Sequence, residues 1–416
     1  MRSIESQCQA VREAFDDTPA LSTKIKNQIL LGIADALIEC TPFILSENLK
    51  DIQRGQAAGL DVAMIDRLTL TAERIIGIAD GVRIVAGLED PIGEEMSAWT
   101  VEKSGLSLQK IRVPIGVIGM IYEARPNVTV DAATLCFKTG NAVVLRGSSS
   151  AFESNRALVE VMHDVMQAHD VTRDLIQLLD NTSREGVDTF VKLNQYLHLV
   201  IPRGGASLIK HVIQTATVPS IETGAGNCHI YVDREANLKK AIPIIVNAKI
   251  QRPSVCNALE TVIIHEKIAG DFLPALAKEL ESKGVTLKGD DAARAIVPTI
   301  FPAVEDDWAL EFLNLTLAVK IVSSLGEAEA HIHRYGTKHT EVILTEDARR
   351  ADHFVKTVDA AAVGVNVSTR FTDGGEFGFG AEIGISTQML HARGPMGLPE
   401  LTSYKYIMKG DYLVRK

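Results

Sequence analysis

The stretch GVIGMIYEARPNVTVDAATLCFKTGNAVVLRGSS, residues 116–149, decides the fold class. It begins with the apolar run VIGMIY, passes through the helix-favouring segment NVTVDAATLCFKTGN and ends with a second apolar run, AVVL. Neither apolar run alternates with polar residues, so we predict two strands that are buried on both faces. Two such strands joined by a helix form a β-α-β unit, which indicates a parallel sheet covered by helices.

The same rhythm continues on the C-terminal side. Helices are predicted around NRALVEVMHDVMQ and EGVDTFVKLN, and strands around DLIQLLD and LHLVIPRGG. A second alternating set starts at CHIYVD, residues 228–233, and runs to TEVILTED. We therefore predict an α/β fold with two doubly wound parallel sheets, whose ligands should lie at the carboxyl ends of the strands. No linker marks the boundary near 223–227, so the rhythm alone places it there.

The N-terminal part differs in pattern. Residues 4–88 carry apolar residues at helical spacing with few strand signals. Residues 97–113, SAWTVEKSGLSLQKIRV, hold two alternating runs separated by turn residues, which predicts a hairpin leading into the first buried strand. An exposed hairpin can pair with a neighbouring subunit, or it can simply be solvated.

Composition and charge exclude several classes of function. The chain has 43 Lys and Arg against 53 Asp and Glu, a net charge of −10 that is spread along the sequence. This balance argues against nucleic acid and against a polybasic membrane patch. No apolar run approaches the roughly 20 residues that span a bilayer, and the N-terminus lacks the apolar core of a signal peptide. The five cysteines are widely spaced without a CxxC pair, which is typical of a reducing cytoplasm.

One cysteine, Cys256, lies in an unusual place, within NAKIQRPSVCNALETVIIH at residues 247–265. The helix before it must end ahead of Pro253, and ETVIIH is a predicted strand, so Cys256 falls on the connection between them. A thiol on a connection is accessible, and Lys249 and Arg252 nearby would favour the reactive thiolate. A small buried side chain at a packed turn is the alternative interpretation.

Glu222 precedes a Gly-Ala-Gly loop in SIETGAGNCHIYVD, one α/β excursion ahead of Cys256. Glycines let the backbone turn sharply or approach a ligand closely. A carboxylate and a thiol could therefore meet at adjacent strand ends, as an acid or base and a nucleophile. A surface or helix-capping acid is the alternative interpretation of Glu222.

Other polar motifs point less directly to a ligand. LRGSSSAFESNRAL and IPRGGASLIKHV each combine a strand, a small-residue turn with an arginine, and a helix, which attracts phosphate. Neither has the dinucleotide or P-loop fingerprint. His331, His333 and His339 match no usual zinc spacing, and His265 lacks the second histidine of HExxH. We expect these to be surface or hydrogen-bonded histidines, and no metal site.

Five segments together resemble the aldehyde dehydrogenase superfamily. They span residues 113–406 and read VPIGVIGMIYEARPNVTVDAATLCFKTGNAVVLRGSSSA, ETGAGNCHIYVD, AKIQRPSVCNALETV, GTKHTEVILTED and RFTDGGEFGFGAEIGISTQMLHARGPMGLPELTSYKY. Within the superfamily they resemble the acyl-phosphate reductase branch of proline biosynthesis. The resemblance implies an NADPH-binding domain at 1–223 with an oligomerisation hairpin at 97–113, a catalytic domain at 224–385, and a return at 386–416 that ends in an oligomerisation strand.

The implied reaction is the NADPH-dependent reduction of L-glutamate 5-phosphate to L-glutamate 5-semialdehyde with release of phosphate. In the family the cysteine of RPSVCN is the nucleophile, so Cys256 would form a thioester that accepts hydride. Asn127 resembles the oxyanion-binding asparagine, assisted by the Cys256 N–H, although Arg125 could occupy that place. Glu222 matches the base that activates water in hydrolytic relatives. A reductase does not need that step, so the role of Glu222 stays open.

The resemblance also implies ligand contacts. Ser149 falls where NAD-selective relatives carry a glutamate, and the loss of this acid favours the 2′-phosphate of NADPH. Arg125 or Arg370 could clamp the α-carboxylate of the substrate, and a structural salt bridge is an equal alternative for either. The resemblance implies cofactor contacts by Arg146 at the adenosine ribose and by Glu311 at the nicotinamide ribose. The other implied cofactor contacts are Ser148, Ser149 and, near the phosphates, Arg203, Gly204, Gly205 and Ala206.

The expected partners are the small substrate, further copies of the chain in a dimer or tetramer and, transiently, glutamate 5-kinase. No nucleic acid or membrane is expected, and the expected compartment is the cytoplasm. Two other functions stay open: an acylating aldehyde dehydrogenase that uses coenzyme A, and a non-catalytic relative that serves as a scaffold for a kinase.

Overall fold

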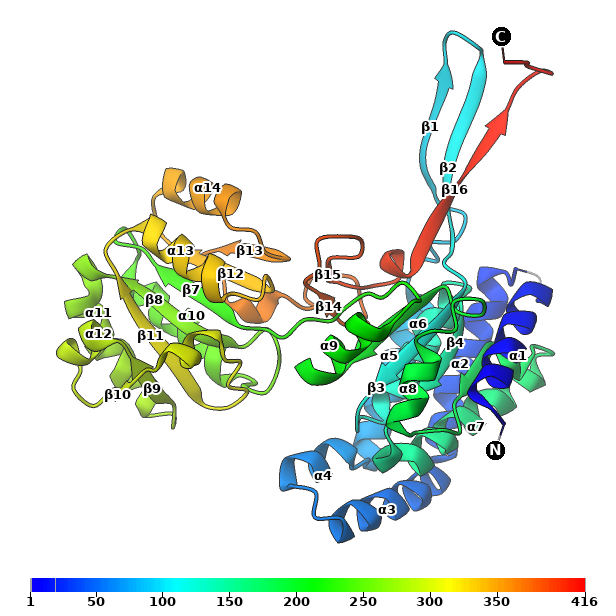
Figure 1. The fold of residues 1–416 in the computed structure, drawn as a ribbon, viewed down its shortest axis with the longest axis horizontal. Helices are drawn as coiled ribbons and strands as arrows, with labels where there is room; N and C mark the ends of the chain where they lie inside the picture. Colours follow the sequence, from blue (N-terminus) through cyan, green and yellow to red (C-terminus); the bar gives the residue numbers. More distant parts are fainter. Residues whose placement is uncertain (1, 19, 416) are drawn as a thin grey trace. The chain divides into compact units, whose positions relative to one another are not determined.

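The computed structural model describes residues 2–18 and 20–415, and it contains two compact units (Figure 1). Unit 1 holds the chain up to Glu222 together with Phe379–Gly384 and Met396–Lys416. Unit 2 holds Thr223–Gly378 and Ile385–Pro395. Each unit has its own parallel sheet, and the two are described separately below.

The chain crosses between the units more often than the sequence indicates. The expected ranges, 1–223, 224–385 and 386–416, contain a single return at residue 386, whereas residues 385–395 belong to unit 2. This segment carries two short paired strands, β14 (Ile385–Ser386) and β15 (Gly394–Pro395). Ser386 also forms a backbone bridge with Thr223, so the segment stays with unit 2.

Unit 1 contains a four-stranded parallel sheet with the order β5-β4-β3-β6. Strands β3 and β4 are the two apolar runs of the β-α-β unit predicted from the sequence, and α6 (Asn127–Lys138) connects them. The chain passes outward from β3 to β5 and returns to β6 on the other side of β3, so the sheet is doubly wound. The strands are β3 (Val117–Tyr122), β4 (Ala142–Arg146), β5 (Ile176–Leu178) and β6 (Leu199–Arg203).

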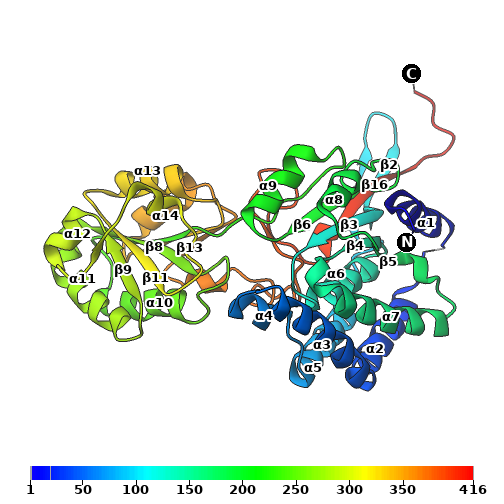
Figure 2. The ribbon, with the colours of Figure 1, turned by 60° about the horizontal axis from the view of Figure 1, so that its bottom comes forward.

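Helices cover both faces of this sheet (Figure 2). α6 and α7 lie against one face with α2 and α5 packed over them, while α1 and α8 lie on the other face. No single described helix is long and apolar enough to cross a membrane, although α2 and α3, bent by 69°, meet that test together. The helices are α1 (Ile4–Asp17), α2 (Thr23–Glu39), α3 (Thr41–Ala57), α4 (Val62–Leu68), α5 (Ala72–Gly87), α7 (Phe152–Ala168), α8 (Arg184–Phe190) and α9 (Ala206–Thr215).

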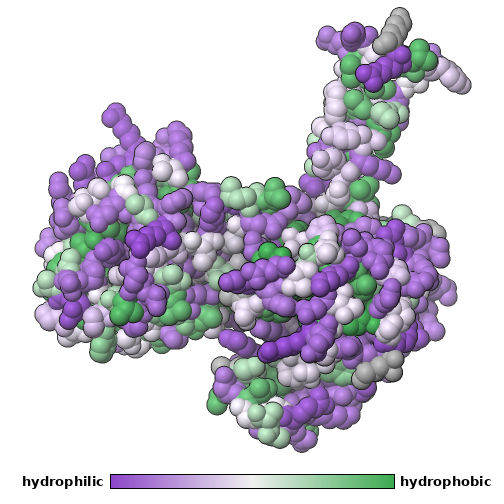
Figure 3. All heavy atoms as spheres, in the orientation of Figure 1, coloured by the Kyte–Doolittle hydropathy of each residue, from purple (hydrophilic) through white to green (hydrophobic). Residues whose placement is uncertain are grey.

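A three-stranded antiparallel ribbon projects from unit 1 (Figure 1). β1 (Glu95–Val101) and β2 (Leu106–Pro114) form the predicted hairpin, and β16 (Thr402–Lys409) pairs along the other edge of β2. Large side chains, including Trp99, Tyr406 and Met408, are exposed on this ribbon. Figure 3 shows hydrophobic residues among hydrophilic ones along it. The ribbon therefore presents two strand edges and apolar side chains to its surroundings.

Unit 2 contains a seven-stranded sheet whose neighbouring strands are all parallel, with the order β10-β9-β11-β8-β7-β12-β13. Side chains alternate along its central strands. Ile230 and Val232 of β7 pack with α10 and α11, whereas Tyr231 between them packs with α13 and α14. The sheet is thus buried on both faces, which confirms the predicted fold of two doubly wound sheets with a small β element.

The strands of unit 2 are β7 (Cys228–Val232), β8 (Leu259–His265), β9 (Thr286–Gly289), β10 (Phe301–Pro302), β11 (Thr316–Val322), β12 (Thr340–Leu344) and β13 (Ala362–Val365). The helices are α10 (Leu238–Ile250), α11 (Glu266–Glu281), α12 (Asp291–Ile296), α13 (Leu325–Tyr335) and α14 (Ala348–Thr357).

One histidine of unit 2, His331 on α13, is buried among aromatic rings. Its ring lies 5.5, 5.4 and 4.7 Å from the ring centroids of His229, Trp308 and Tyr335. Burial lowers the pKa of His331 to about 3, and positively charged neighbours act in the same direction. The ring therefore stays neutral in the folded protein at a pH at which an unfolded chain would protonate it.

We predict that acid destabilises the protein in part through His331. The unfolded pKa is about 6.5, so the stability contribution is present above about pH 6.5 and is lost as the pH falls toward the folded pKa of about 3. Between about pH 7 and pH 5 this linkage costs about 2 kcal/mol. His331→Phe, which takes up no proton, should lose correspondingly less stability over this range when urea unfolding is followed by circular dichroism.

His333→Phe is the matched control, because His333 lies on the same helix but is exposed. This control should keep the wild-type pH dependence. An H331F protein that loses as much stability as the wild type between the two pH values would contradict the assignment.

Candidate active site

Cys256 lies on the connection between α10 and β8, as the sequence predicts. α10 ends at Ile250, ahead of Pro253, and β8 begins at Leu259. Residues 251–258 form this connection, here called the cysteine loop, and Cys256 within it is partly exposed. A loop that leads into a parallel strand lies at the amino end of that strand. The thiol therefore lies at the amino edge of the unit 2 sheet, and not at the carboxyl ends where ligands were expected.

Only glycine fits at position 226, because the cysteine loop lies against it. The Gly-Ala-Gly turn precedes β7, which pairs with β8, so the turn and the loop meet at the amino ends of neighbouring strands. A Cβ atom on Gly226 would lie 1.5 Å from the backbone oxygen of Cys256 and 2.7 Å from its Cα. The same oxygen accepts a hydrogen bond of 3.2 Å from the Cys228 thiol. Because glycine has no side chain, the two backbone segments can approach each other closely at this position.

Glu311 supports this turn from another segment. Its carboxylate accepts the Gly226 N–H at 2.9 Å. Burial raises the pKa of Glu311, while this hydrogen bond and the charge of Lys249 oppose the shift. The structure therefore brings Glu311 to the turn that carries the cysteine loop. Its contact with the nicotinamide ribose stays a prediction.

A buried ion pair joins the two ends of the cysteine loop. Lys249, in the last turn of α10, lies 2.6 Å from Glu260 on β8, and both side chains are fully buried. The Lys249 ammonium also donates to the Leu259 carbonyl at 2.9 Å, and the Glu260 carboxylate accepts the Leu313 N–H at 3.2 Å. Burial raises the pKa of Glu260 to about 7 and lowers that of Lys249, against their mutual attraction. The sequence predicts that the charge of Lys249 favours the Cys256 thiolate. In the structure, Glu260 balances this charge.

A second segment fastens to the cysteine loop near both of its ends. The Nε–H of Arg370, in the short helix η4 (Thr369–Phe371), donates to the side-chain oxygen of Gln251 at 2.9 Å. The Asn257 amide donates to the carbonyl oxygens of Thr372 at 2.8 Å and Arg370 at 3.4 Å. Arg370, a predicted substrate contact, therefore lies beside the loop that carries Cys256.

Several predicted cofactor contacts follow β4 at the carboxyl edge of the unit 1 sheet. Arg146 ends β4, and its guanidinium donates to two backbone carbonyls just before α8, at 2.6 and 2.7 Å. Beyond it, the hydroxyls of Ser148 and Ser150 lie 2.8 Å apart, and Ser149 is exposed. Arg146 thus anchors the segment before α8, and its contact with the adenosine ribose stays a prediction.

The other predicted cofactor contacts follow β6, where the sheet reverses its winding direction. Arg203 ends β6, Gly204 and Gly205 form the turn, and Ala206 begins α9. The Gly205 N–H donates to the Glu123 carboxylate at 3.1 Å. Doubly wound sheets bind phosphates at such a switch point, and the contact of these residues with the cofactor phosphates stays a prediction.

The remaining predicted residues lie on turns of unit 1. Arg125 is exposed between β3 and α6. Asn127 begins α6, and its amide donates to the Asp131 carboxylate at 3.0 Å. Glu222 is the last residue of unit 1, whereas the cysteine loop belongs to unit 2. The catalytic and substrate-binding roles of these three residues stay predictions.

Comparison with known proteins agrees with this architecture. The family model described as the aldehyde dehydrogenase family matches residues 2–303. The chain belongs to the aldehyde dehydrogenase family. It is 54% identical over 413 residues to the gamma-glutamyl phosphate reductase of Moorella thermoacetica, covering 99% of both chains. It is 51% identical over 416 residues to that of Bacillus mycoides, covering 100% of both. These full-length relatives confirm the branch of the superfamily that the motifs indicate.

Solved structures of family members share the fold. The crystal structure of gamma-glutamyl phosphate reductase from Thermotoga maritima has a TM-score of 0.97 at 48% identity and covers 100% of both chains. An acetylating aldehyde dehydrogenase from Geobacillus thermoglucosidasius has a TM-score of 0.69 at 16% identity, also over 100% of both chains. At that identity the second likeness shows a common fold alone.

Aldehyde dehydrogenases use nicotinamide cofactors, and the β4 turn holds a predicted cofactor contact, Ser149. Arg54, on α3, donates to the Ser149 carbonyl at 3.4 Å, and its side chain is 51% exposed while it pairs with Asp51 and Glu153. The preference of this turn for a 2′-phosphate stays a prediction. The sequence did not reveal Arg54, because it comes from a helix 95 residues before the serine.

Sequence reasoning also missed the supporting roles of Glu260, Cys228 and Glu123. Glu260 carried a usable signal, since a carboxylate at the start of a buried apolar strand needs a partner, and Lys249 lies eleven residues before it. The other two residues had no signal beyond their places next to predicted strand ends. Their contacts arise where separate segments of the chain meet.

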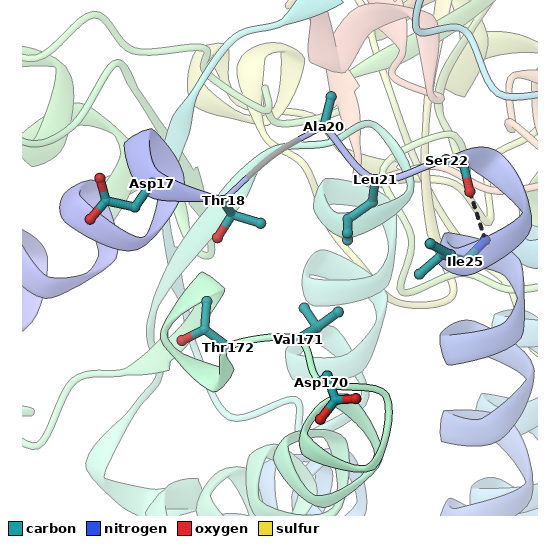
Figure 4. Close-up of a pocket in the computed structure, with 9 residues that line it drawn as sticks. All are labelled: Asp17, Thr18, Ala20, Leu21, Ser22, Ile25, Asp170, Val171 and Thr172. Carbon is teal, nitrogen blue, oxygen red and sulfur yellow. Dashed lines mark hydrogen bonds between the residues drawn. The ribbon is translucent and has the colours of Figure 1, made fainter.

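Unit 1 has a cavity of about 480 Å³ whose lining, drawn in Figure 4, includes none of the predicted site residues. It is formed by the junction of α1 with α2 and by the turn at Asp170, Val171 and Thr172. The described residues that line it include two aspartates but no arginine, lysine, histidine or cysteine. Such a lining does not suit an anionic substrate or nucleophilic chemistry.

Gly226→Ala should displace the cysteine loop, because a methyl group cannot lie 1.5 Å from a backbone oxygen. We expect a loss of about 1–3 kcal/mol in stability. A shift of about 1 Å at a nucleophile can cost about 100-fold in rate, so dehydrogenase activity should fall to that extent in protein that circular dichroism shows to be folded. Gly270→Ala on α11, where a Cβ meets nothing within 4 Å, is the control and should stay active. Wild-type activity in G226A would contradict the close contact.

Proposed function

We propose that the chain reduces L-glutamate 5-phosphate to L-glutamate 5-semialdehyde with NADPH and releases phosphate, the second step of proline biosynthesis from glutamate. The observation that carries this proposal is that several contacts fix the loop on which Cys256 lies. Cys256 is partly exposed on a loop that Gly226, the Lys249–Glu260 pair and Arg370 support. Full-length relatives named gamma-glutamyl phosphate reductase support the choice of substrate.

Cys256 acts as the nucleophile in this proposal. Its thiolate attacks the carbonyl carbon of the acyl phosphate, the carbon–oxygen bond to phosphate breaks, and phosphate leaves with the electron pair. NADPH, when bound, supplies the hydride that reduces the resulting thioester. The reduced carbon then expels the sulfur, which releases the aldehyde and restores the thiolate. Arg252, on the same loop, favours the thiolate by its charge.

Asn127 and the Cys256 N–H stabilise the negative oxygen that forms at each tetrahedral stage. Donors at such a place are effective when they are already oriented. The hydrogen bond from the Asn127 amide to Asp131 uses one N–H, orients the amide and leaves its second N–H for the substrate. Arg125 is the alternative donor. Hydride transfer, and not hydrolysis, breaks down the thioester, so Glu222 is not needed to activate water. The dependence of activity on phosphate tests its role.

The residues assigned to NADPH lie on the turns that follow β4 and β6, with Glu311 from unit 2. Ser148, Ser149 and Arg54 would hold the 2′-phosphate, and Arg146 the adenosine ribose. Arg203, Gly204, Gly205 and Ala206 would lie along the phosphates, and Glu311 would hold the nicotinamide ribose.

The proposed partners follow from the ribbon and from the substrate. Exposed apolar side chains on β1 and β16 would be covered by another copy of the chain in a dimer or tetramer. An acyl phosphate is short-lived in water, so a transient contact with glutamate 5-kinase would protect it. We propose the cytoplasm as the compartment, since the five cysteines are not joined in disulfides.

The test is NADP reduction with L-glutamate 5-semialdehyde, with and without phosphate, for the wild type and Cys256→Ala. We expect activity to require phosphate and to fall to background in the folded variant, because no thioester can form. Cys40→Ala is the matched control, since Cys40 is the other partly exposed cysteine among the described residues, and it should keep its activity.

Other outcomes would replace parts of this proposal. Activity in folded C256A would show that the nucleophile is misassigned. Activity without phosphate would indicate hydrolysis, with Glu222 as the base, and a requirement for coenzyme A would indicate an acylating aldehyde dehydrogenase.

A further inference from the structure

Two arginines of unit 2 lie close to Cys256. Arg252 belongs to the cysteine loop itself and is exposed, and Arg370 is partly buried on the neighbouring η4 segment. Arg252 and Cys256 are both close enough to act electrostatically on the Arg370 guanidinium. From the sequence, Arg252 is predicted only to favour the thiolate. Arg370 is predicted only to bind the α-carboxylate of the substrate.

The loop and the Arg370 segment are held in register at two points. Gln251, the neighbour of Arg252, accepts the Nε–H of Arg370 at 2.9 Å. Asn257, the neighbour of Cys256, donates to the carbonyls of Arg370 and Thr372. The bond to Gln251 uses the inner nitrogen of the guanidinium, so it fixes the guanidinium plane without using the outer edge. Arg370 is therefore held as a fork beside the loop that carries the thiol.

On the cysteine loop and residues 369–373, two arginines are accompanied by one carboxylate, that of Asp373. Burial lowers the pKa of Arg370, the charge of Asp373 opposes this shift, and the smaller repulsion from Arg252 adds to it. Asp373 attracts Arg370, but its carboxylate also accepts the N–H groups of Gly375 and Glu376 at 2.9 and 3.3 Å. Two arginines on adjoining segments that carry a single carboxylate, itself engaged by backbone N–H groups, are suited to an additional anion.

The geometry of the substrate identifies which anion this is. The carbonyl carbon that Cys256 attacks is bonded through one oxygen to phosphorus, so the phosphoryl group must lie beside the thiol. The α-carboxylate lies at the opposite end of the glutamyl chain, four carbon–carbon bonds away from that carbon. We propose that Arg252 and Arg370 bind the phosphoryl group and stabilise phosphate as it leaves with the electron pair, which leaves Arg125 for the α-carboxylate. This inference rests on the proposed function.

The test measures the KM for phosphate in semialdehyde oxidation by Arg252→Ala, Arg370→Ala and the wild type. We expect the KM for phosphate to rise about 10- to 100-fold in each variant, while the KM for the semialdehyde changes by less than about threefold. Arg349→Ala is the matched control, because Arg349 is an exposed arginine on α14 of the same unit, and it should keep both values.

Butanal, an aldehyde without an α-carboxylate, separates the two roles of an arginine. If Arg370 binds phosphate, R370A should show the raised KM for phosphate with butanal as well. A variant whose KM for phosphate is unchanged, and whose defect appears only with the semialdehyde, would overturn the inference and restore the carboxylate clamp. Failure of the proposed function looks different, since the wild type itself would then show no dependence on phosphate.

A measurement on the wild type covers the case in which the variants do not fold. Iodoacetate is anionic and iodoacetamide is neutral, and both alkylate cysteine thiolates. Inorganic phosphate should slow the labelling of Cys256 by iodoacetate several-fold and leave the labelling by iodoacetamide nearly unchanged. Equal effects of phosphate on the two reagents would overturn an anion site beside the thiol.

Discussion

The candidate active site depends on a backbone contact that only glycine allows. Gly226 lies against the backbone of Cys256 so closely that a Cβ atom would be 1.5 Å from the cysteine oxygen. The contact exists because β7 and β8 are neighbours, which brings the segments ahead of both strands to the same edge of the sheet. Cys228 and Glu311 then complete it, since one donates to the Cys256 oxygen and the other accepts the Gly226 N–H. The position of the thiol is thus set by the sheet, although the cysteine belongs to a loop.

Charge is arranged around this contact in two layers. Inside, Lys249 and Glu260 neutralise each other at 2.6 Å with no exposure to water, and removal of either partner would leave an unpaired buried charge. Outside, Arg252 is exposed on the loop itself, and Arg370 is fastened to the neighbouring Gln251. The buried pair therefore contributes to the frame of the loop, whereas the arginines lie on its outer side.

The sequence predicts the sheets and the connection that carries Cys256, because both follow from local patterns. Unalternating apolar runs indicate parallel strands, and Pro253 forces α10 to end before the cysteine. It does not predict which segments meet at the edge of a sheet. The Glu311 contact with the Gly226 turn and the place of Arg54 beside Ser149 join segments far apart in the chain, so spacing carries little sign of them. The predicted cofactor contacts lie on turns at the carboxyl ends of β4 and β6, whereas the cysteine loop lies at the amino edge of its own sheet.

The central claim is that Cys256 carries the acyl group during the reaction. The most direct measurement mixes the protein with L-glutamate 5-semialdehyde and NADP without phosphate, quenches it rapidly in acid and analyses the peptide containing Cys256 by mass spectrometry. A glutamyl adduct on Cys256 that disappears when phosphate is added before the quench is the predicted result. NADPH formation with an unmodified Cys256, or an adduct on another residue, would contradict it.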